Sequence, residues 1–340
     1  MKATFYTGGK GFRIEESQPL MPEAGQVGID VAYCGVCGTD LHVYHGKMDA
    51  RIGHHRVIGH EMSGIVSKIG AGVDNVRVGQ PVVVRPLNHC GDCPACHAGH
   101  SHICHNLKFL GVDSDGAFQQ EWIVPAHTVH TLPDDMSLQY GALIEPVSVA
   151  VHDVRRAKVK PGEDVLVIGG GPIGMLVAMV ARNAGARVML SEVSEARLAF
   201  ARALGFETMN PMKANIVEVI NAKTASKGAD VVFEVSGTQA GIDAMTETAA
   251  TRGRIVMVAI HTSKPEVDMF RFFWRELELL GARVYAAEDF EEAIRLVSQG
   301  VIDCEKMITD VWELERIGEA FEALSDNPHA MKSLVKCGSL

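Results

Sequence analysis

A glycine-rich turn between an apolar strand and a helix is the feature that most constrains the fold of this 340-residue chain. The strand 165–168 leads into a G-x-G-x-x-G match, and a helix is expected from Ile173 to Ala184. Gly169 permits the tight turn, Gly171 lets the backbone approach a pyrophosphate, and Gly174 allows close helix–strand packing. The predicted cofactor-binding residues of this turn are Gly169, Gly171, Pro172, Ile173 and Gly174.

The segment around this turn alternates strands with helices. Further strands are expected at 187–190, 231–235 and 255–258, with a helix at 195–204. This order predicts a doubly wound, parallel Rossmann sheet that helices cover on both faces. Glu192 follows the second strand, about 20 residues after the turn, where an acid binds the ribose of a dinucleotide. The alternative is a glycine turn in a sheet that binds nothing.

The first part of the chain is typical of a β-rich domain. Apolar residues alternate with smaller or polar ones over 27–33, and short apolar strands at 64–69 and 82–84 are separated by Gly and Pro. The pattern changes near Val147, and helices are expected again in the tail after Glu288. We therefore predict a catalytic domain at 1–149, completed by 286–340, and a dinucleotide-binding domain at 150–285.

Clustered cysteines indicate a metal site, because 6 of the 8 cysteines fall between Cys34 and Cys104. Four soft ligands within one short segment suit a closed, structural zinc ion. An iron–sulfur cluster is the alternative, but its fourth cysteine would come sooner and precede proline. The predicted structural zinc ligands are Cys90, Cys93, Cys96 and Cys104.

A second candidate metal site combines Cys37 with His60 and Glu61. One thiolate, one imidazole and one carboxylate leave a zinc coordination position open, and an open position is typical of catalytic zinc. A buried thiol beside a core histidine would explain the same residues. Cys34 and Cys37 also form C-x-x-C, which could be a redox pair, although no thioredoxin-like unit surrounds it.

Charge and hydropathy exclude other classes of function. The net charge of −10 gives no overall attraction to nucleic acid or acidic lipid. A nucleic-acid zinc ribbon would need a basic face, and 90–104 contains no Lys or Arg. No stretch reaches the roughly 20 apolar residues of a membrane span, and 1–4 lacks the pattern of a signal peptide. We expect a cytoplasmic protein with a small-molecule substrate and neither a nucleic-acid nor a membrane partner.

Five motifs in order resemble the zinc-containing medium-chain dehydrogenases from end to end. They are the cysteine segment 35–42, the segment 59–61, the four-cysteine lobe with 116–121, the segment 142–146, and the turn 169–174. Glu145, Pro146 and the segments 275–277 and 281–283 are most similar to the polyol, threonine and sugar-acid branch. The resemblance implies a GroES-like catalytic domain, a Rossmann domain, and a homodimer or homotetramer.

The resemblance also implies roles for individual residues. Cys37, His60 and Glu61 become ligands of a catalytic zinc, so that each chain would hold two zinc ions. Glu145 matches a glutamate that contacts this zinc directly or through water. Both acids are therefore expected at the same ion.

A proton relay through Thr39 and His42 is implied as well, although a plain loop hydroxyl and a surface histidine would look the same in the sequence. Sorbitol dehydrogenases place a tyrosine after the relay histidine, where this chain has Val43. That departure argues against sorbitol itself as the substrate. Arg283 could pair with a substrate carboxylate or form a structural salt bridge.

The function predicted from the sequence is zinc-dependent hydride transfer between a secondary alcohol and NAD. NAD is favoured over NADP because Glu192 would repel a 2′-phosphate and no adjacent Lys or Arg compensates. Arg197, one helical turn further on, is expected to cover the adenine or to pair with Glu195. An arginine near this position can also accommodate a 2′-phosphate, which would favour NADP. The alternative from another class is a non-catalytic, zinc-structured NAD(P)-binding scaffold, which would be expected to lose the catalytic zinc ligands.

Overall fold

A computed structural model describes residues 1–16, 18, 21–261 and 263–338 of the chain. The chain divides into two compact units, one formed by Met1–Pro146 with Ala286–Leu340 and the other by Val147–Tyr285. In the described part of the chain, no helix is both long and apolar enough to cross a bilayer.

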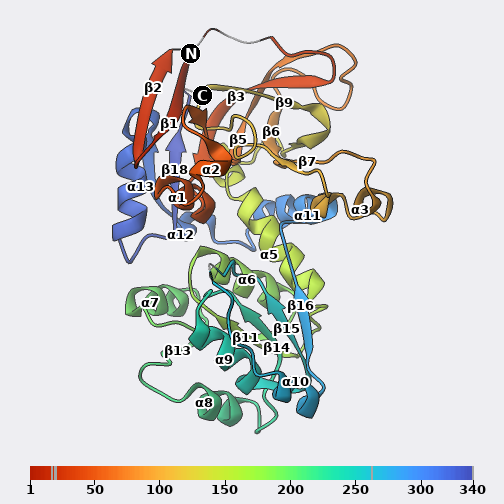
Figure 1. Cartoon of the computed structure of the whole chain (residues 1–340), viewed down its shortest axis with the longest axis vertical. Coiled ribbons are helices and arrows are strands. Elements are labelled where there is room, and N and C mark those ends of the chain that lie inside the picture. Colours follow the sequence, from red (N-terminus) through yellow and green to blue (C-terminus); the bar gives the residue numbers. More distant parts are fainter. Residues whose placement is uncertain (17, 19–20, 262, 339–340) are drawn as a thin grey trace. The chain divides into compact units, whose positions relative to one another are not determined.

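The first unit is built around a mixed sheet with the order β10-β6-β5-β3-β18-β17, and β9 also pairs with β3 (Figure 1). The predicted strand is confirmed as β3, and Val27, Ile29 and Val31 are fully buried. The alternation is incomplete, however: Gly28, Ala32 and Cys34 are buried as well, and Tyr33 is only partly buried. A smaller sheet has the order β2-β1-β4, and β7 pairs with β8. The strands are β1 (Lys2–Gly8), β2 (Gly11–Glu16), β3 (Gln26–Gly35), β4 (Arg56–Val57), β5 (Glu61–Ile69), β6 (Pro81–Val84), β7 (Leu87–Asn88), β8 (Lys108–Phe109), β9 (Glu121–Pro125), β10 (Val129–Thr131), β17 (Ile308–Glu313) and β18 (Lys332–Lys336).

The helices of the first unit are short where they carry the site and longer in the tail. Near the site lie α1 (Gly38–Tyr44), α2 (Asp49–Ile52), α3 (Pro94–His97) and α4 (Leu138–Gly141). The tail holds α11 (Ala287–Ser298), α12 (Cys304–Met307) and α13 (Ile317–Asp326). Short 3₁₀ turns lie at Ser101–Ile103, Ala126–Thr128 and Leu314–Arg316. A further helix, α5 (Ile144–Arg156), contains the boundary between the two units.

The tail contributes strands that the sequence analysis did not predict. Helices were expected after Glu288, but β17 and β18 also form there, and β18 pairs antiparallel with β3. The register places Val335 opposite Cys34, so the tail continues the sheet next to the cysteine segment. Because β18 and β3 lie about 300 residues apart in the sequence, no local pattern could predict that they pair.

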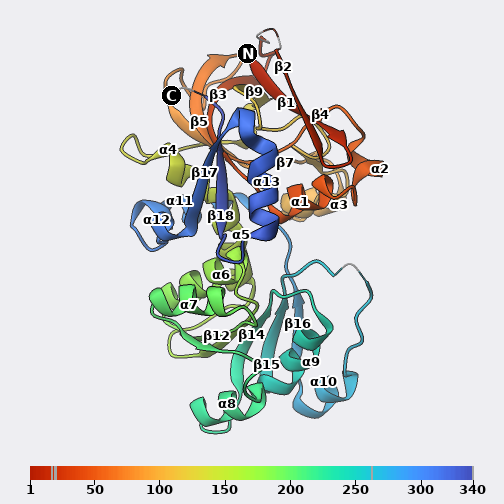
Figure 2. The ribbon, with the colours of Figure 1, turned by 90° about the vertical axis from the view of Figure 1, so that its left-hand side faces the viewer.

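The second unit is a six-stranded parallel sheet with the order β13-β12-β11-β14-β15-β16. The order reverses between β11 and β14, as in a doubly wound Rossmann sheet. Helices α9 and α10 pack beside β15, as Figure 2 shows. The elements are β11 (Asp164–Ile168), α6 (Pro172–Asn183), β12 (Arg187–Ser191), α7 (Glu195–Ala203), β13 (Glu207–Met209), α8 (Ile216–Lys223), β14 (Ala229–Glu234), α9 (Gln239–Thr248), β15 (Ala249–Met257), α10 (Met269–Arg275) and β16 (Glu278–Gly281).

Candidate functional site

Cys37 caps the short helix α1, directly after β3 ends. Its backbone N–H donates to Oδ2 of Asp40 over 2.9 Å, and the N–H of Thr39 approaches its Sγ at 3.5 Å. These two contacts form a capping box, which fixes the direction in which the thiol leaves the strand. The Cys37 sulfur is therefore held by local backbone geometry.

Strand pairing brings His60 and Glu61 to Cys37. Glu61 opens β5 and lies opposite Gly35 at the end of β3. A Cβ atom at Gly35 would lie 2.4 Å from Oε2 of Glu61, so only glycine leaves room for the carboxylate. The ligand atoms of Cys37, His60 and Glu61 all lie within 4.8 Å of one another, and the three residues form one group.

Buried charges surround this group of three. Oδ1 of Asp40 lies 3.6 Å from Nδ1 of His60, and Lys332 forms an ion pair with Glu61. Burial alone lowers the pKa of His60, but the negative charges of Asp40 and Cys37 outweigh it and raise that pKa well above its ordinary value. The ring thus sits in a field that favours positive charge.

The donor set and its field both fit a zinc ion. A carboxylate facing Nδ1 of His60 leaves Nε2 with a lone pair for a metal, as is usual for histidines that bind zinc. Thiolate, imidazole and carboxylate are the three ligand types that zinc accepts in proteins. The negative field that raises the pKa of His60 would equally stabilise a bound divalent cation.

Glu145 lies in the first turn of α5 and is buried. It is not a member of the group within 4.8 Å. Against the effect of burial, its charge contributes to raising the pKa of both His60 and Lys332, so its carboxylate acts on the same cluster. A direct or water-mediated contact between Glu145 and zinc stays a prediction.

Thr39 and His42 lie three residues apart on α1 and therefore share a face of that helix. Both are partly exposed. Burial, followed by the charges of Lys47 and His45, lowers the pKa of His42. The lowered pKa favours the neutral imidazole, which is the form that can accept a proton in the predicted relay.

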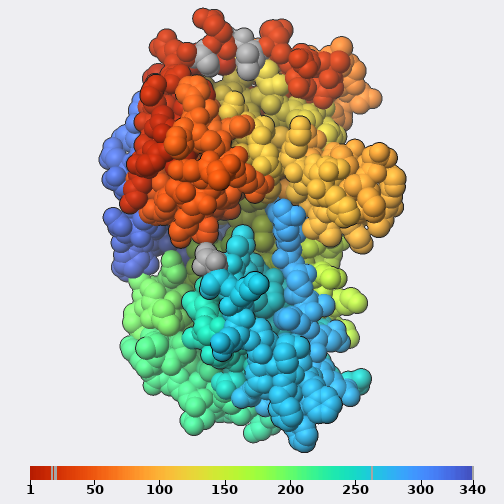
Figure 3. Space-filling view, viewed as in Figure 1, coloured from red at the N-terminus to blue at the C-terminus, as the bar shows by residue number. Residues whose placement is uncertain are grey.

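The four cysteines of the lobe come together as a tight cluster. The part of the chain around residues 90–105, in orange to yellow, projects from the surface (Figure 3). Three sulfur–sulfur distances are 3.4 Å for Cys90–Cys104, 3.5 Å for Cys93–Cys96 and 3.8 Å for Cys93–Cys104. Bonds of about 2.3 Å from one zinc ion give a tetrahedron with edges of about 3.8 Å. The distances exceed the roughly 2.05 Å of a disulfide. They fit four thiolates around a single ion, whereas a cluster of several iron atoms would hold them further apart.

Backbone donors prepare the lobe for thiolates. The N–H groups of His105 and Asn106 donate to the sulfurs of Cys93 and Cys104 over 3.4 and 3.3 Å. The hydrogen bonds that the Cys93 sulfur accepts from backbone N–H groups, first that of His105 and then that of Cys96, lower the pKa of Cys93 to about 6. Such donors stabilise the deprotonated form that binds metal.

Cys34 does not behave as a redox partner of Cys37. Cys34 is fully buried, and its thiol donates to the carbonyl of Gly35 over 3.7 Å. Burial raises the pKa of Cys34 well above its ordinary value, whereas a reactive thiol needs a lowered pKa. The alternative of a C-x-x-C redox pair has no support in this geometry.

The glycine turn of the second unit has the shape of a dinucleotide-binding loop. Gly169 has a φ of 106°, and its N–H donates to the carbonyl of Ser191 over 2.8 Å. A Cβ atom at Gly174 would lie 1.9 Å from the carbonyl oxygen of Gly169. Gly171 caps α6 without a side-chain acceptor, Pro172 has no N–H, and the first intrahelical bond runs from Met175 to Gly171, so the N–H groups of Ile173 and Gly174 face the open end of the helix. Such an end binds phosphate.

Glu192 is largely buried at the end of β12 and is tied to that turn. Its Oε2 accepts from the N–H of Gly170 over 2.7 Å, and its Oε1 accepts from the N–H groups of Val193 and Ser194 over 2.7 and 2.9 Å. Nη1 of Arg197 lies 3.8 Å from Oε2. The carboxylate is thereby held at the edge where a cofactor ribose would lie.

The expected pairing of Arg197 with Glu195 is wrong. Glu195 instead accepts from Asn210 over 2.7 Å and pairs with Lys213 at 2.8 Å. These partners come from the loop after β13, which local spacing did not reveal. Arg197 faces Glu192 instead.

Sequence reasoning missed two buried residues at the candidate zinc site. Asp40 could have been found, because a carboxylate at the third helical position after Cys37 is the signature of a capping box. Lys332 could not, because it lies on β18, far from Glu61 in sequence. Its ammonium also donates to the carbonyl of Val36 over 3.2 Å.

Comparisons with known proteins agree with this geometry. Residues 23–134 match the alcohol dehydrogenase GroES-like domain, and residues 172–299 match the zinc-binding dehydrogenase family. A 2-dehydro-3-deoxy-L-galactonate 5-dehydrogenase from Pseudoalteromonas atlantica is 52% identical over 100% of this chain and 99% of its own length. An (R,R)-butanediol dehydrogenase from Neisseria gonorrhoeae is 35% identical over 98% of each chain.

A solved structure gives the same picture. The 2R,3R-butanediol dehydrogenase of Bacillus subtilis superposes with a TM-score of 0.90 at 31% identity and covers 99% of each chain. Relatives above 30% identity over nearly the whole length, together with the two matched domains, exclude a merely local likeness. The chain belongs to the zinc-binding alcohol dehydrogenases, a family of NAD-dependent oxidoreductases.

Proposed function

We propose that this enzyme oxidises a secondary hydroxyl group of a deoxy sugar acid and transfers the hydride to NAD. The 52% identity to the Pseudoalteromonas galactonate-derivative dehydrogenase, over essentially both whole chains, is the observation that carries the choice of substrate. The relatives named for butanediol and xylulose share only 30–35% of their residues with this chain. The choice of a sugar acid over a plain diol or polyol rests on this difference in sequence identity.

The first unit holds the reacting centre in this proposal. Cys37, His60 and Glu61, with Glu145 close by, would hold the catalytic zinc. Zinc supplies a Lewis acid that stabilises negative charge developing on the substrate oxygen. The negative charge of Asp40 faces Nδ1 of His60, and the buried Lys332 offsets part of the surplus negative charge of the acids.

The proton of the substrate hydroxyl leaves through the exposed side of α1. Thr39 would accept it at its hydroxyl oxygen and pass it to His42. The lowered pKa of His42, caused first by burial, leaves a neutral ring ready to take the proton and release it to solvent. The half-exposed position of both side chains supports this route.

The second unit binds the cofactor in this proposal. The glycine turn would receive the pyrophosphate, and Glu192 would accept a hydrogen bond from an adenosine ribose hydroxyl. A carboxylate oxygen has two lone pairs, so Glu192 can keep its backbone donors and still bind a hydroxyl. The same negative charge disfavours the 2′-phosphate of NADP.

A substrate panel tests the proposal directly. Purified zinc-loaded enzyme is offered deoxy sugar acids, aldonates, pentitols and 2,3-butanediol with NAD, and NADH formation is followed by absorbance. We expect kcat/KM for a deoxy sugar acid to exceed that for butanediol or a pentitol by at least tenfold. Comparable or better use of butanediol would contradict the choice of substrate class.

We also propose that the enzyme assembles with further copies of itself. The exposed aromatic surface of α10 supports this: Phe270, Phe273 and Trp274 are 64%, 76% and 72% exposed, and the rings of Phe270 and Trp274 stack at 5.9 Å. An exposed apolar patch of this kind usually marks an interface. The helix directly precedes β16, the edge strand of the parallel sheet, which pairs with β15 on one side and, among the described residues, with no strand on the other.

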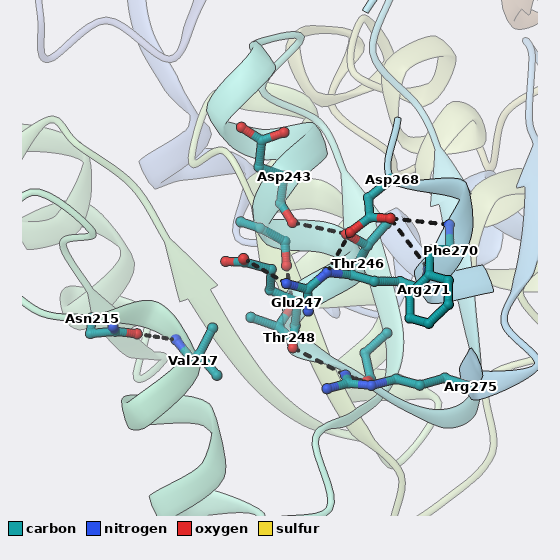
Figure 4. Close-up of polar contacts among 12 residues, drawn as sticks. Asn215, Val217, Asp243, Thr246, Glu247, Thr248, Asp268, Phe270, Arg271 and Arg275 are labelled. Atoms are coloured by element: carbon teal, nitrogen blue, oxygen red, sulfur yellow. Dashed lines mark hydrogen bonds and ion pairs between the residues drawn. The ribbon is translucent and has the colours of Figure 1, made fainter. Parts of the chain in front are cut away.

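The opposite face of α10 is firmly attached to its own unit (Figure 4). Asp268 caps the helix by accepting from the N–H of Phe270 over 3.0 Å. Arg271 pairs with Glu247 at 3.0 Å, and Arg275 donates to the carbonyl of Ala249 over 2.8 Å. The aromatic side chains are thus presented on a rigid helix, as a second copy would require.

Light scattering tests this interface. Phe273→Ser should shift the protein toward the monomer mass at micromolar concentration, while Met212→Ser, which alters an exposed methionine elsewhere in the same unit, should not. An unchanged mass for the Phe273 variant would contradict the assignment of α10 as the interface.

We place the enzyme in the cytoplasm. All eight cysteines are free thiols in the structure, and four of them form the lobe cluster. A reducing compartment keeps such thiols available for zinc. Fractionation of cells that express the tagged protein tests this, and recovery in an oxidising compartment would contradict it.

A further inference from the structure

A fully buried glutamate lies at the point where the strand order of the second unit reverses. Glu234 ends β14 and is level with Ile168 of β11 on one side and Met257 of β15 on the other. In doubly wound sheets the ligand binds outside the carboxyl ends of the strands at this reversal. The surroundings of Glu234 therefore bear on the cofactor.

The Glu234 carboxylate organises the turn that follows β14. Its Oε1 accepts from the N–H groups of Ser236 and Gly237 over 3.0 and 3.1 Å, and also from the Ser236 hydroxyl. Gly237 has a φ of 67°, a left-handed conformation that suits glycine. The acid thus replaces missing backbone partners in a tight turn, as a capping residue does.

The same residue also holds the loop that follows β15. The backbone carbonyl of Glu234 accepts from the N–H groups of Val258 and Ala259 over 3.0 and 3.1 Å. Further along the segment that leads to α10, Nε2 of His261 lies 3.3 Å from Oε2 of Glu234, within ion-pair distance. The His261 side chain is only 13% exposed. The stretch 258–261 therefore contacts Glu234 at two points: through backbone hydrogen bonds at Val258 and Ala259, and through the close approach of the His261 ring to the carboxylate.

These two loops lie on the side of the glycine turn opposite Glu192. Glu192 follows β12, on one side of β11, whereas Glu234 and His261 follow β14 and β15, on the other side. The glycine turn directly borders the first of the two loops, because a Cβ atom at Gly169 would lie 2.9 Å from the Ser236 nitrogen. If Glu192 takes the adenosine ribose and the turn takes the pyrophosphate, the nicotinamide half must extend over these loops.

We infer that His261 is a positioning residue for the nicotinamide half of the cofactor, acting through its pair with Glu234. The inference rests on the proposed use of NAD and adds a residue to it. With the pair formed, the loop 258–261 is ordered before the cofactor arrives. Without the pair, the loop is ordered in only a fraction of the molecules before the cofactor arrives. Only those molecules can bind the cofactor at once, so the apparent affinity for the cofactor is reduced to that fraction of its full value.

Direct binding of NADH tests the inference without depending on turnover. Fluorescence titration compares the wild type with His261→Leu and His261→Gln in the zinc-loaded enzyme. The glutamine amide nitrogen can reach the position of Nε2, whereas leucine fills the space without a donor. We expect the NADH Kd to rise about tenfold for His261→Leu and to stay within about threefold for His261→Gln.

Binding of AMP separates a local effect from general damage. AMP occupies only the adenosine side, so calorimetry should give the same AMP Kd for all variants. His329→Leu, an exposed histidine of the other unit, is the matched control and should change neither ligand.

Two outcomes would overturn the inference: an unchanged NADH Kd in His261→Leu, or an equal loss of NADH and AMP binding. If the leucine variant does not fold, the glutamine variant decides, because the inference requires it to bind NADH nearly as well as the wild type. A wild type that binds AMP but neither NADH nor NAD would instead contradict the proposed function.

Discussion

Replacing Lys332 by methionine removes a buried positive charge from the candidate zinc site. Methionine keeps most of the length of the side chain, so the change isolates the loss of the ammonium group. The variant leaves the Glu61 carboxylate and the Val36 carbonyl buried without this partner. Breaking a buried ion pair on one side costs about 3–5 kcal/mol, because the remaining charge keeps its desolvation penalty.

The expected change in melting temperature follows from the size of the unit. The first unit holds about 200 residues, and for a unit of this size 1 kcal/mol shifts the melting temperature by about 2–4 °C. We therefore expect Lys332→Met to lower the melting temperature of the zinc-loaded enzyme by about 10 °C. Circular dichroism during heating measures it.

The pH dependence of this loss has a definite sign. Burial alone lowers the pKa of Lys332, but the charges of Glu61 and Cys37 raise it above 10.5. A raised pKa means that the stabilisation is complete below the unfolded value and is lost only as the pH rises through the folded one. The difference between wild type and variant should therefore be constant from pH 6 to 9.

Two further variants test the reasoning. Lys336→Met changes a half-exposed lysine on the same strand and should alter the melting temperature by no more than about 2 °C. Glu61→Gln would also remove a proposed zinc ligand, so it is added to Lys332→Met in protein without the catalytic zinc, where removing the unpaired charge should recover more than half of the loss. If Lys332→Met is as stable as Lys336→Met, or if the double variant recovers nothing, the reasoning is refuted.

Four other predictions follow from the sites. Cys93→Ser should reduce the zinc content from two ions per chain to one, measured by atomic emission, and should destabilise the fold; a wild type with fewer than two ions would contradict this. Glu145→Gln should lower kcat/KM by more than tenfold and the melting temperature by less than 3 °C, and activity within a few-fold of wild type would refute the role. Wild-type kcat/KM should be at least tenfold higher with NAD than with NADP, and Glu192→Ala should reduce that ratio mainly by weakening NAD; equal use of both cofactors by the wild type would oppose it. His42→Ala should slow oxidation most near pH 7, where the lowered pKa of His42 leaves the wild-type ring neutral, and the deficit should shrink in concentrated imidazole buffer; a pH-independent deficit would contradict the relay.

Local spacing predicted the parts of the molecule whose contacts are local. The glycine turn and Glu192 belong to one strand–helix–strand unit, and Gly170 contacts Glu192 directly. The four cysteines of the lobe lie within one short segment, so their spacing alone indicated a shared ion. In such cases the chain has little freedom to place the residues elsewhere.

Contacts between distant segments were not predictable in this way. Lys332 reaches Glu61 only because β18 and β5 both pair with β3, and this pairing depends on the whole sheet. His261 reaches Glu234 because β14 and β15 are neighbours in the second sheet. A lysine, a histidine or an aromatic residue in these segments carries no motif, and only the fold gives it a partner.

The pairing of β18 with β3 also determines when the zinc site can be completed during synthesis. The ribosome makes β3, β5 and all of the second unit before it makes β18, and domains generally fold as units as they emerge. The second unit can therefore fold while Glu61 still lacks its lysine. The nascent chain gains its parallel sheet first, and the candidate zinc site acquires its buried lysine only after translation has passed residue 332.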